Sequence, residues 1–480
     1  MPRTDPATPA TGGPGPADEL LDHISQHDGP DYRRLRGLQE EFAEHNVLQV
    51  YSRDEIRSGG KRYFPPLPVP MLMPDEEYRR LRYSATLLES VVPTLSNRLF
   101  GGMGPTMDLL AVPPALRPYI ELEIPLGVSA SRHDHLPGDR GWMLVETNAN
   151  SLGLTDVDDY NRLVRGNGLL SRFLTRRAFT ADCPMDLIAR AALAKCAGLP
   201  VDGTPTVALV DWRAYLEASR YDHDRRAARY RRNGFDTVIC HPEELRYERG
   251  RLWYGARPVH VVHRHFLLED MIEDPEPARA VTEAAAEASV VMVSPYLDEW
   301  LTNKAVFALL HEARALGLLD AAAGALVEET IPRTWLVARD APPDARFIVR
   351  PEDVPPLPVA ELVTKPLIGS MGAGVVFGAH VGAEDFHGTV TADVAAGRPR
   401  IVQEVIPASA RPVPRLCAEG LRTFPGQPHP SLFVVDGAAR AMAVRTYDGE
   451  RAGACKLGGE VFVGGVWYPR PALDPTDGGC

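Results

Sequence analysis

The sequence WMLVETNAN, residues 142–150, changes from apolar to oxygen-rich within one predicted strand. Glu146 and Asn148 are two residues apart, so on a strand both side chains point to the same face, with their bases about 7 Å apart. A carboxylate and an amide oxygen that converge in this way are suitable ligands for a hard cation such as Mg²⁺. Taken alone, a solvated strand face that runs into an Asx-rich turn explains the motif better. The interpretation therefore depends on what else reaches this face.

The preceding run IELEIPLGVSASRHD, residues 120–134, predicts another strand. The loop HLPGDRG, residues 135–141, separates the two runs, and we expect them to form an antiparallel pair. Such a hairpin would bring Asp134 alongside Glu146 as a third oxygen ligand. Arg132 shares the face of Asp134 and could meet an anion there, although a lone arginine on a strand is usually a surface residue.

Lys304 stands at the predicted start of a helix, in LTNKAVFALLHEARALGLL. Thr302 or Asn303 could cap the N-terminus of this helix. A lysine in the first turn opposes the helix dipole, a conflict of about 0.3–1 kcal/mol that a shared phosphate would resolve. An exposed lysine with its ammonium group in water explains Lys304 equally well.

Lys365 is stronger evidence for a phosphate site. It alternates with Val363 on an apolar strand, directly before Pro366, so we expect it to be half buried and to need a partner. The loop that follows can close its backbone N–H groups over phosphates, and consists of Gly369, Ser370, Met371, Gly372, Ala373 and Gly374. It is not a Walker A loop, because its lysine precedes the glycines and no GK[ST] occurs.

The strand RIVQEVIPA has the pattern of a hinge that reads adenine through backbone groups while an acid takes a ribose hydroxyl. The predicted hinge consists of Gln403, Glu404, Val405 and Ile406. An ordinary sheet strand with its polar side in water is the alternative. Arg445, at the end of AMAVR, follows a hairpin signal at Asp436-Gly437 and could clamp a phosphate or carboxylate bidentately.

Composition limits the classes of partner. The chain has 480 residues, of which 44% are hydrophobic and 24% charged, as in globular proteins with room for about three domains. A net charge of -12 argues against nucleic acid or an anionic membrane as a partner. The six cysteines are scattered, and no signal peptide or apolar span of ~18 residues occurs, so we expect reduced thiols and a cytoplasmic location.

These motifs together resemble a circularly permuted ATP-grasp family, similar to the synthetase domain of glutathionylspermidine synthase. The resemblance covers about residues 119–468 and rests on Arg132 and Asp134 before LVETNAN, followed by TNKAVFALL, LVTKPLIGSMGAGV, IVQEVIP and AMAVR. The metal strands precede the nucleotide-binding elements, the reverse of the order in most ATP-binding ligases. This order is the main discriminator between the two groups.

The resemblance implies an ATP-dependent carboxylate–amine ligase. Such an enzyme forms an amide or peptide bond through an acyl phosphate and releases ADP and phosphate. By this resemblance Asp134, Glu146 and Asn148 would hold Mg²⁺, while Arg132 and Arg445 would stabilise the transferring phosphoryl group. Lys304 and Lys365 would bind the α- and β-phosphates of ATP, residues 369–374 would form a lid, and residues 403–406 would hold adenine. The partners would be a small-molecule or peptide carboxylate and an amine, and a homo-oligomer is left open.

The expected fold class is α/β (α+β), with a helical N-terminal region and a small Rossmann-like unit built from TVALVDW, a charged helix, DTVIC and HVVHRHF. The predicted organisation is a disordered leader (1–30), a helical cap (31–115), metal-binding strands (116–204), the small α/β unit (205–290), a helical bridge with the ATP-binding half (291–471) and a flexible tail (472–480).

Two features depart from the family. Ser370 and Met371 stand in the lid where the family has charged residues, and there is no room for an appended amidase domain. Glutathione and spermidine are therefore not carried over as substrates.

Two other functions are considered. His133-x-His135 and His263-x-His265 could belong to a metalloenzyme, although zinc would want three or four ligands. The chain could also be a non-catalytic ATP-binding scaffold of ATP-grasp architecture, which only a turnover assay would distinguish from a ligase.

Overall fold

The protein is described here by a computed structural model. It describes residues 16–25, 66–149, 152, 154–272, 274–354, 357–369, 372–407, 409–417, 420–448 and 461–470. The predicted tail, the loop residues Ser370 and Met371, and most of the predicted leader lie outside this described part. The described chain is a mixed α/β protein, as the sequence predicts.

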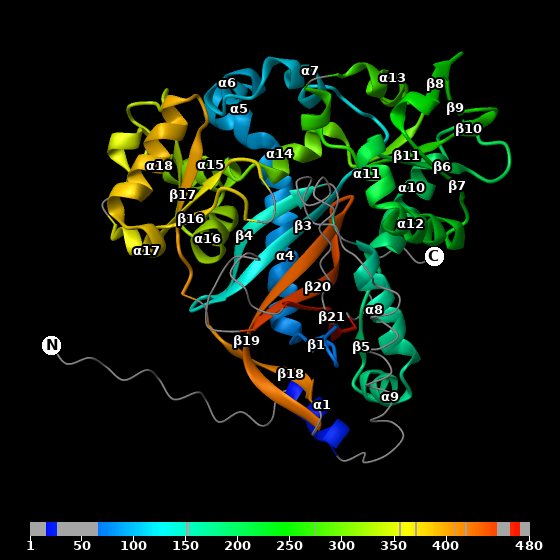
Figure 1. Cartoon of the computed structure of the whole chain (residues 1–480), viewed down its shortest axis with the longest axis horizontal. Coiled ribbons are helices and arrows are strands. Elements are labelled where there is room, and N and C mark those ends of the chain that lie inside the picture. Colours follow the sequence, from blue (N-terminus) through cyan, green and yellow to red (C-terminus); the bar gives the residue numbers. More distant parts are fainter. Residues whose placement is uncertain are drawn as a thin grey trace.

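An eight-stranded sheet forms the centre of the molecule (Figure 1). Its strand order is β1-β21-β20-β19-β3-β4, with β18 paired to β19 and β5 paired to β21. The strands are β1 (Met71–Leu72), β3 (Ala130–Gly138), β4 (Gly141–Ala149), β5 (Phe179–Thr180), β18 (Arg411–Cys417), β19 (Gly420–Val435), β20 (Ala438–Asp448) and β21 (Val461–Pro469). Among the described strands of this sheet, β1 pairs with β21 in parallel and the other named pairs are antiparallel.

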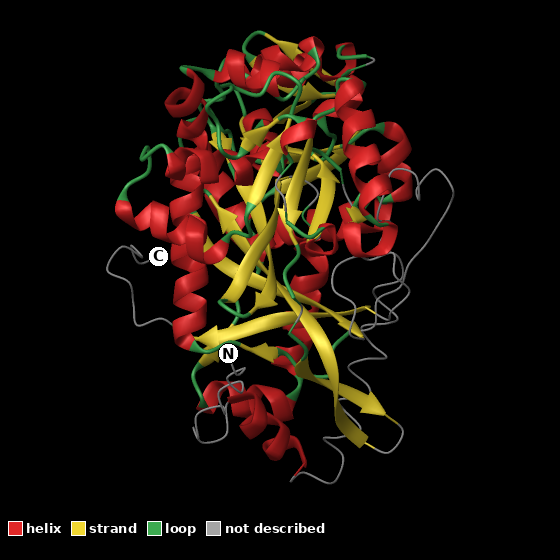
Figure 2. Cartoon of the chain, turned by 90° about the vertical axis from the view of Figure 1, so that its left-hand side faces the viewer, coloured by secondary structure: helices red, strands yellow, loops and turns green. Residues whose placement is uncertain are grey.

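Helix α4 (Asp75–Val91) covers one face of this sheet and contacts β19, β20 and β21. Its buried residues Tyr78, Leu81, Ala85 and Leu88 follow one another at spacings of three or four, which is the apolar stripe of an amphipathic helix. Figure 2 shows helices on both flanks of the strands. On β3 and β4, the face turned away from α4 carries polar residues, among them Asp134 and Glu146.

The predicted pairing of β3 with β4 is confirmed, with Asp134 opposite Glu146 and Arg132 opposite Asn148. The predicted loop 135–141 is mostly strand, because the two strands continue until only Asp139 and Arg140 join them. Residues 120–126 are not part of β3. Helix α7 (Arg117–Ile120) ends at the first of them and carries a proline in its first turn, where the missing N–H is not needed. The predicted strand is found over Gly127–Val128 (β2) and again from Ala130.

A β-bulge interrupts the β3–β4 ladder. Asp134 pairs with Glu146 but His135 pairs with Leu144, so Val145 has no partner in this ladder. The extra residue reverses the alternation of side chains along β4. Leu144 is therefore buried against the helices, while Glu146 lies on the other face with Asp134.

The predicted hairpin at Asp436-Gly437 is confirmed as the connection between β19 and β20. Both turn residues have positive φ, 49° and 78°, as a two-residue type I′ turn requires. Lys195 donates a hydrogen bond to Asp436 at 2.8 Å and holds this turn against helix α10 (Pro184–Cys196).

The predicted small α/β unit is confirmed as a parallel sheet of order β2-β12-β11-β6-β7. Its strands are β2 (Gly127–Val128), β6 (Thr206–Val210), β7 (Asp236–Cys240), β11 (Val261–Arg264) and β12 (Val291–Val293). Its helices include α10, α11 (Arg213–Ala218), α12 (Arg220–Arg232) and α13 (Arg279–Ala286). A three-stranded antiparallel sheet is inserted before β11, from β8 (Leu245–Glu248), β9 (Arg251–Tyr254) and β10 (Arg257–Val259).

A second five-stranded sheet, of order β14-β13-β17-β15-β16, forms the lobe on the other side of the central sheet (Figure 1). Its strands are β13 (Thr334–Val337), β14 (Ile348–Val349), β15 (Leu362–Pro366), β16 (Val376–Phe377) and β17 (Arg400–Glu404). Helices α14 (Glu299–Thr302), α15 (Ala305–Ala315) and α16 (Ala321–Thr330) precede it. Within the predicted ATP-binding half, α17 (Gly378–Val381) and α18 (Ala383–Ala395) follow β16.

The remaining helices are α1 (Pro16–Ser25), α5 (Leu95–Phe100), α6 (Met103–Leu109), α8 (Leu154–Gly166) and α9 (Gly168–Arg176). Helix α1 falls inside the predicted disordered leader, which is a correction to that prediction. Leu20 and Ile24, four residues apart, are buried in the core beneath β1 and α9, so this short segment has an apolar face to bury. None of the helices in the described part of the chain is both long and apolar enough to cross a bilayer.

Candidate functional site

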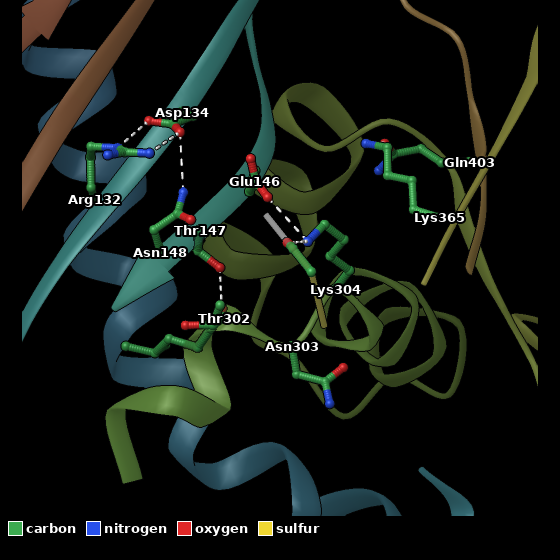
Figure 3. A network of polar contacts seen from close by, with 12 residues as sticks. Arg132, Asp134, Glu146, Thr147, Asn148, Thr302, Asn303, Lys304, Lys365 and Gln403 are labelled. Atoms are coloured by element: carbon green, nitrogen blue, oxygen red, sulfur yellow. Dashed lines mark hydrogen bonds and ion pairs between the residues drawn. The ribbon is translucent and has the colours of Figure 1, made fainter. Parts of the chain in front are cut away.

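Polar side chains from the eight-stranded sheet and the second five-stranded sheet lie near one another in Figure 3. Asp134 and Glu146 come from paired positions on β3 and β4, and Lys365 comes from β15. Lys304, between α14 and α15, contacts Glu146 on β4 and the Gly369 carbonyl shortly after β15. The predicted site residues of these elements thus gather at the boundary between two sheets.

Asp134 is held by two arginines. Arg132 donates from Nε to Oδ1 and from Nη2 to Oδ2, both at 2.8 Å, and Arg445 reaches Oδ2 at 3.3 Å from β20, on the far side of β19. Asn148 Nδ2 donates to the same Oδ2 at 3.1 Å. Burial opposes ionisation of Asp134, but the two guanidinium groups outweigh it and hold its pKa well below the usual range. Asp134 is therefore a carboxylate at neutral pH.

Lys304 ties three segments together. Its backbone N–H donates to the Leu367 carbonyl at 2.9 Å, and its Nζ donates to the Gly369 carbonyl at 3.0 Å. The same ammonium lies 3.1 Å from Glu146 Oε1, and the lysine side chain is only 6% exposed. Lys304 therefore connects the carboxylate strand β4 to the start of the glycine-rich loop.

The segment before Lys304 is fixed to β4 by hydrogen bonds. The Thr147 hydroxyl donates to the Leu301 carbonyl, and the backbone N–H of Ala149 donates to Thr302 Oγ1 at 3.1 Å. Of the two expected capping residues, Asn303 accepts from the N–H of Ala305 at 3.0 Å. These bonds set the position of Lys304 relative to Glu146.

Lys365 has a neutral partner. Its Nζ donates to Gln403 Oε1 at 2.7 Å, and Gln403 Nε2 donates in turn to Thr334 Oγ1 at 2.8 Å. Burial lowers the pKa of Lys365 to about 8; the Lys304 ammonium adds to this effect and the Glu146 carboxylate opposes it. The half-buried lysine expected from the sequence is thus found with an amide oxygen as its acceptor.

Gln403, predicted as part of the adenine hinge, lies inside the second five-stranded sheet. Its side chain is 1% exposed and is committed to Lys365 and Thr334, and its backbone lies in the middle of the sheet, between β13 and β15. The N–H groups of Glu404 and Val405 are also used, by the carbonyls of Arg333 and Glu361 at 2.9 and 2.8 Å. The N–H groups of this segment are thus engaged within the protein up to Val405, and a role of residues 403–406 in holding adenine stays a prediction.

Cationic side chains anchor both ends of the glycine-rich loop. Lys304 binds the Gly369 carbonyl, and Arg400 Nη2 donates to the Gly374 carbonyl at 2.5 Å. Gly374 has a φ of 69°, a conformation that a side chain would disfavour. Arg400 is 4% exposed and was missed in the sequence, because an arginine opening an apolar strand carries no signal of this contact.

His429 is a second residue that the sequence analysis missed. It lies opposite Arg445 in the β19–β20 ladder, on the same face as Ser431, which pairs with Asp134. Burial lowers the pKa of His429 to about 3, with a further contribution from Arg445 and opposition from Asp134. The alternation of Gln427, His429 and Ser431 along β19 is the signal that could have found it.

The two histidine pairs of the metalloenzyme hypothesis are used inside the protein. His133 Nε2 lies 3.1 Å from Glu89 Oε1, and the His263 ring accepts or donates at 2.9 Å to the Tyr230 hydroxyl and stacks on His265. Within the described residues, no group of three or more His, Cys, Asp or Glu is arranged to hold a metal ion. The structure therefore offers no support for a zinc site.

No family model and no curated protein matches the sequence. A glutathione synthetase-like effector from Globodera pallida, in apo form, superimposes with a TM-score of 0.56 at 9% identity, covering 92% of this chain and 99% of its own. This likeness shows a shared fold.

Two other solved structures are less similar. A protein from Methylobacillus flagellatus, provisionally named γ-glutamylcysteine synthetase, has a TM-score of 0.39 at 12% identity and covers 77% of this chain and 84% of its own. The D-cycloserine synthetase DcsG has a TM-score of 0.27 at 15% identity and covers 57% of this chain and 95% of its own. We base no argument on these two.

The charges of the site favour an anionic ligand. Four cations, Arg132, Lys304, Lys365 and Arg445, stand against the two carboxylates of Asp134 and Glu146. Lysine is rare in this chain, with five among 52 Lys and Arg residues, yet two of the five meet here. A ligand with several negative charges, such as a polyphosphate, is the chemical complement of this arrangement.

Proposed function

We propose that the protein is an ATP-dependent carboxylate–amine ligase, an ATP-grasp enzyme that forms an amide or peptide bond and releases ADP and phosphate. The observation that carries this proposal is the meeting of Lys304, Lys365 and Glu146 at the boundary of two sheets, beside an anchored glycine-rich loop. The shared fold with a glutathione synthetase-like protein supports it. The circular permutation implied by the order of the motifs is part of the same proposal.

The two lysines would bind the phosphates of ATP. The Lys304 ammonium lies between Glu146 and the Gly369 carbonyl, so an arriving phosphate replaces a carboxylate as its anionic partner. Among the described residues the Lys365 ammonium donates to an uncharged acceptor, and the Glu146 carboxylate acts on it only from a distance, so most of its charge is left for the nucleotide. Backbone N–H groups of the glycine-rich loop, including Gly372 and Gly374, would close over the same phosphates.

The residues predicted to hold Mg²⁺ fit a hard cation unequally. Glu146 is 32% exposed at its side chain and lies on the same strand face as Asn148, so both can offer oxygen ligands. Asp134 already accepts hydrogen bonds from Arg132, Arg445 and Asn148, so it has less capacity than Glu146 to offer an oxygen to a cation. A bound Mg²⁺ would neutralise phosphate charge; Glu146 and Asn148 would be its first ligands.

Arg132 and Arg445 would stabilise the negative charge of the group in transfer. Both are held by Asp134, and Arg132 also by the Leu152 carbonyl, so their guanidinium groups are oriented before a substrate arrives. Fixed donors of this kind act by electrostatic stabilisation and positioning, which dominate phosphoryl-transfer catalysis. Neither arginine needs to exchange a proton, because guanidinium groups stay charged.

The proposal is tested by trapping an activated acid. The purified protein is incubated with ATP, Mg²⁺, hydroxylamine and a panel of amino acids and small peptides, and hydroxamate and ADP are measured. We expect hydroxamate with one class of acid and a matching amount of ADP. Release of AMP and pyrophosphate would instead indicate adenylation and overturn the mechanism.

Variants separate a ligase from a binding scaffold. Glu146→Gln and Lys365→Met should abolish the acid-dependent release of ADP. Lys195→Met is the matched control, because this lysine holds the Asp436 turn outside the site. A wild-type protein that binds ATP but releases no ADP with any acid and amine would support the scaffold and contradict the ligase.

A further inference from the structure

A chain of hydrogen bonds lies behind Lys365. The Thr334 hydroxyl donates to the Pro332 carbonyl at 2.8 Å, Gln403 Nε2 donates to Thr334 Oγ1 at 2.8 Å, and Lys365 Nζ donates to Gln403 Oε1 at 2.7 Å. The chain crosses three neighbouring strands of one sheet. Gln403 on β17 pairs with Thr334 on β13 and with Val363 on β15, and Lys365 lies two residues beyond Val363 on the same strand. It therefore runs from a backbone carbonyl to the ammonium group of the proposed nucleotide site.

The chain has a fixed direction. A threonine hydroxyl carries one hydrogen, and at Thr334 this hydrogen is used by the Pro332 carbonyl, so toward Gln403 the hydroxyl can only accept. The amide of Gln403 must then turn its NH₂ end to Thr334 and its oxygen to Lys365. The Lys365 ammonium, which has donors only, requires the same orientation, so the lysine and the Thr334 hydroxyl hold the amide from its two ends.

Burial prevents water from replacing a link. Thr334 is 0% exposed and Gln403 is 1% exposed, so each depends on the protein for its hydrogen bonds. A reversed Gln403 amide would place its NH₂ against the Lys365 ammonium, two donors with no acceptor between them. The nearby Lys304 ammonium already disfavours a second positive charge at this place.

We propose that Thr334 is a positioning residue, which orients the Gln403 amide so that its oxygen holds the Lys365 ammonium in place for the phosphates of the nucleotide. The expected effect on nucleotide binding rests on the proposed function. The expected effect on Lys365 itself rests on the hydrogen-bond chain alone. Thr334 itself does not touch the ligand. Its effect passes through Gln403.

The experiment compares Thr334→Val, which keeps the shape but removes the hydroxyl, with Thr334→Ser, which keeps the hydroxyl. Two quantities are measured for each. The first is the rate at which Lys365 is acetylated by acetic anhydride near neutral pH without nucleotide, read by peptide mass spectrometry with Lys195 as the internal reference. The second is the Kd of a fluorescent ATP analogue with Mg²⁺.

We expect Thr334→Val to weaken binding of the analogue by about tenfold, the effect of one lost charge-assisted hydrogen bond. Acetylation of Lys365 should become faster relative to Lys195, because an amide that has lost its acceptor at Thr334 no longer holds its oxygen firmly against the ammonium, which then loses its proton more readily. Thr334→Ser should match the wild-type protein in both measurements, since it rescues the hydrogen bond and not the methyl group.

A second variant keeps the test decisive if Thr334→Val folds poorly. Gln403→Met removes the acceptor directly, and its effects on acetylation and Kd should equal those of Thr334→Val. In the double variant the two effects should not add, because both act through one bond. Additive effects would show that Thr334 acts by another route and would overturn the inference.

The outcomes separate this inference from the proposed function. If the wild-type protein binds the nucleotide and Thr334→Val equals Thr334→Ser in both measurements, the positioning role is wrong and the proposed function stands. If the wild-type protein binds no nucleotide but Lys365 acetylation still depends on the Thr334 hydroxyl, the proposed function fails while the orientation of Gln403 by Thr334 is supported.

Discussion

Asp134 and Lys365 are both charged groups withdrawn from water, but the protein satisfies them in opposite ways. On the central sheet, Asp134 is surrounded by Arg132, Arg445 and Asn148, and its charge is neutralised within the protein. On the second sheet, Lys365 faces the neutral oxygen of Gln403. The first arrangement stabilises the fold around the charge, whereas the second leaves a positive charge for something that is not part of the chain.

The largest expected effect breaks the charge-paired side. Arg132→Met removes the bidentate partner of Asp134 and leaves it Arg445 at 3.3 Å and Asn148 at 3.1 Å. Removing one partner of a buried pair typically costs about 3 kcal/mol of unfolding free energy. Urea denaturation measures this cost. Arg398→Met is the matched control: Asp393 also holds two arginines, but Arg398 is 67% exposed, so we expect a loss below about 1 kcal/mol. Equal losses in the two variants would contradict the comparison.

The next effect breaks the side with a neutral partner. Lys365→Met removes a charge that the fold does not need, so the unfolding free energy should change by less than about 1 kcal/mol, the net value of an ordinary hydrogen bond. The Kd for MgATP should nevertheless rise by about ten- to a hundredfold, since hydrogen bonds to charged groups contribute more. Isothermal titration calorimetry measures the Kd. A Lys365→Met variant that unfolds readily but still binds ATP would show that Lys365 serves the fold and not the ligand.

A pH series sharpens the comparison. The pKa of Lys365 is lowered from 10.5 to about 8, so between these values the folded protein has released a proton that the unfolded chain still binds. The contribution of Lys365 to stability therefore rises with pH across this window, while the affinity for ATP falls by up to about tenfold per pH unit above 8. Titrations of ATP at increasing pH should show this fall. Lys365→Arg, which stays charged, should remove the slope.

The smallest expected effect comes from a variant that gives Lys365 the kind of charged partner that Asp134 has. Gln403→Glu gives Lys365 a charged partner, as Asp134 has, so the pKa of Lys365 should rise and its charge should be less available. We expect a fall in ATP affinity of several-fold, up to about tenfold, because a carboxylate next to the phosphates is also repulsive. Fluorescence titration provides the measurement. Tighter binding by Gln403→Glu would mean that Lys365 does not meet the phosphates.

The sequence predicted the elements whose pattern is local. The β3–β4 pairing follows from two runs separated by a short loop, and the Asp436-Gly437 turn follows from the φ angles that this dipeptide adopts readily. The parallel α/β unit follows from the alternation of strand and helix. In each case the partners are close in the sequence, so a short window contains the information.

The errors concern contacts between distant residues. Nothing near Gln403 indicates that Thr334 will fix its amide, and nothing near Arg400 indicates that it will hold Gly374. Helix α1 was missed because its apolar residues are few, and their burial depends on β1 and α9. Such features depend on how the sheets are stacked, which alternation and spacing within a segment do not determine.

The bulge at Val145 has a consequence for how this chain can vary. Trp142 and Leu144 belong to the core, while Glu146 and Asn148 belong to the site, although all four have even numbers. In evolutionary terms β4 therefore consists of two segments whose alternation of inward and outward side chains has opposite phase, and the two segments are joined at one residue. Because Val145 is the extra residue, its deletion would leave a regular ladder with Leu144 still toward the core and Glu146 still toward the site, so the strand can lose this residue and keep its chemistry.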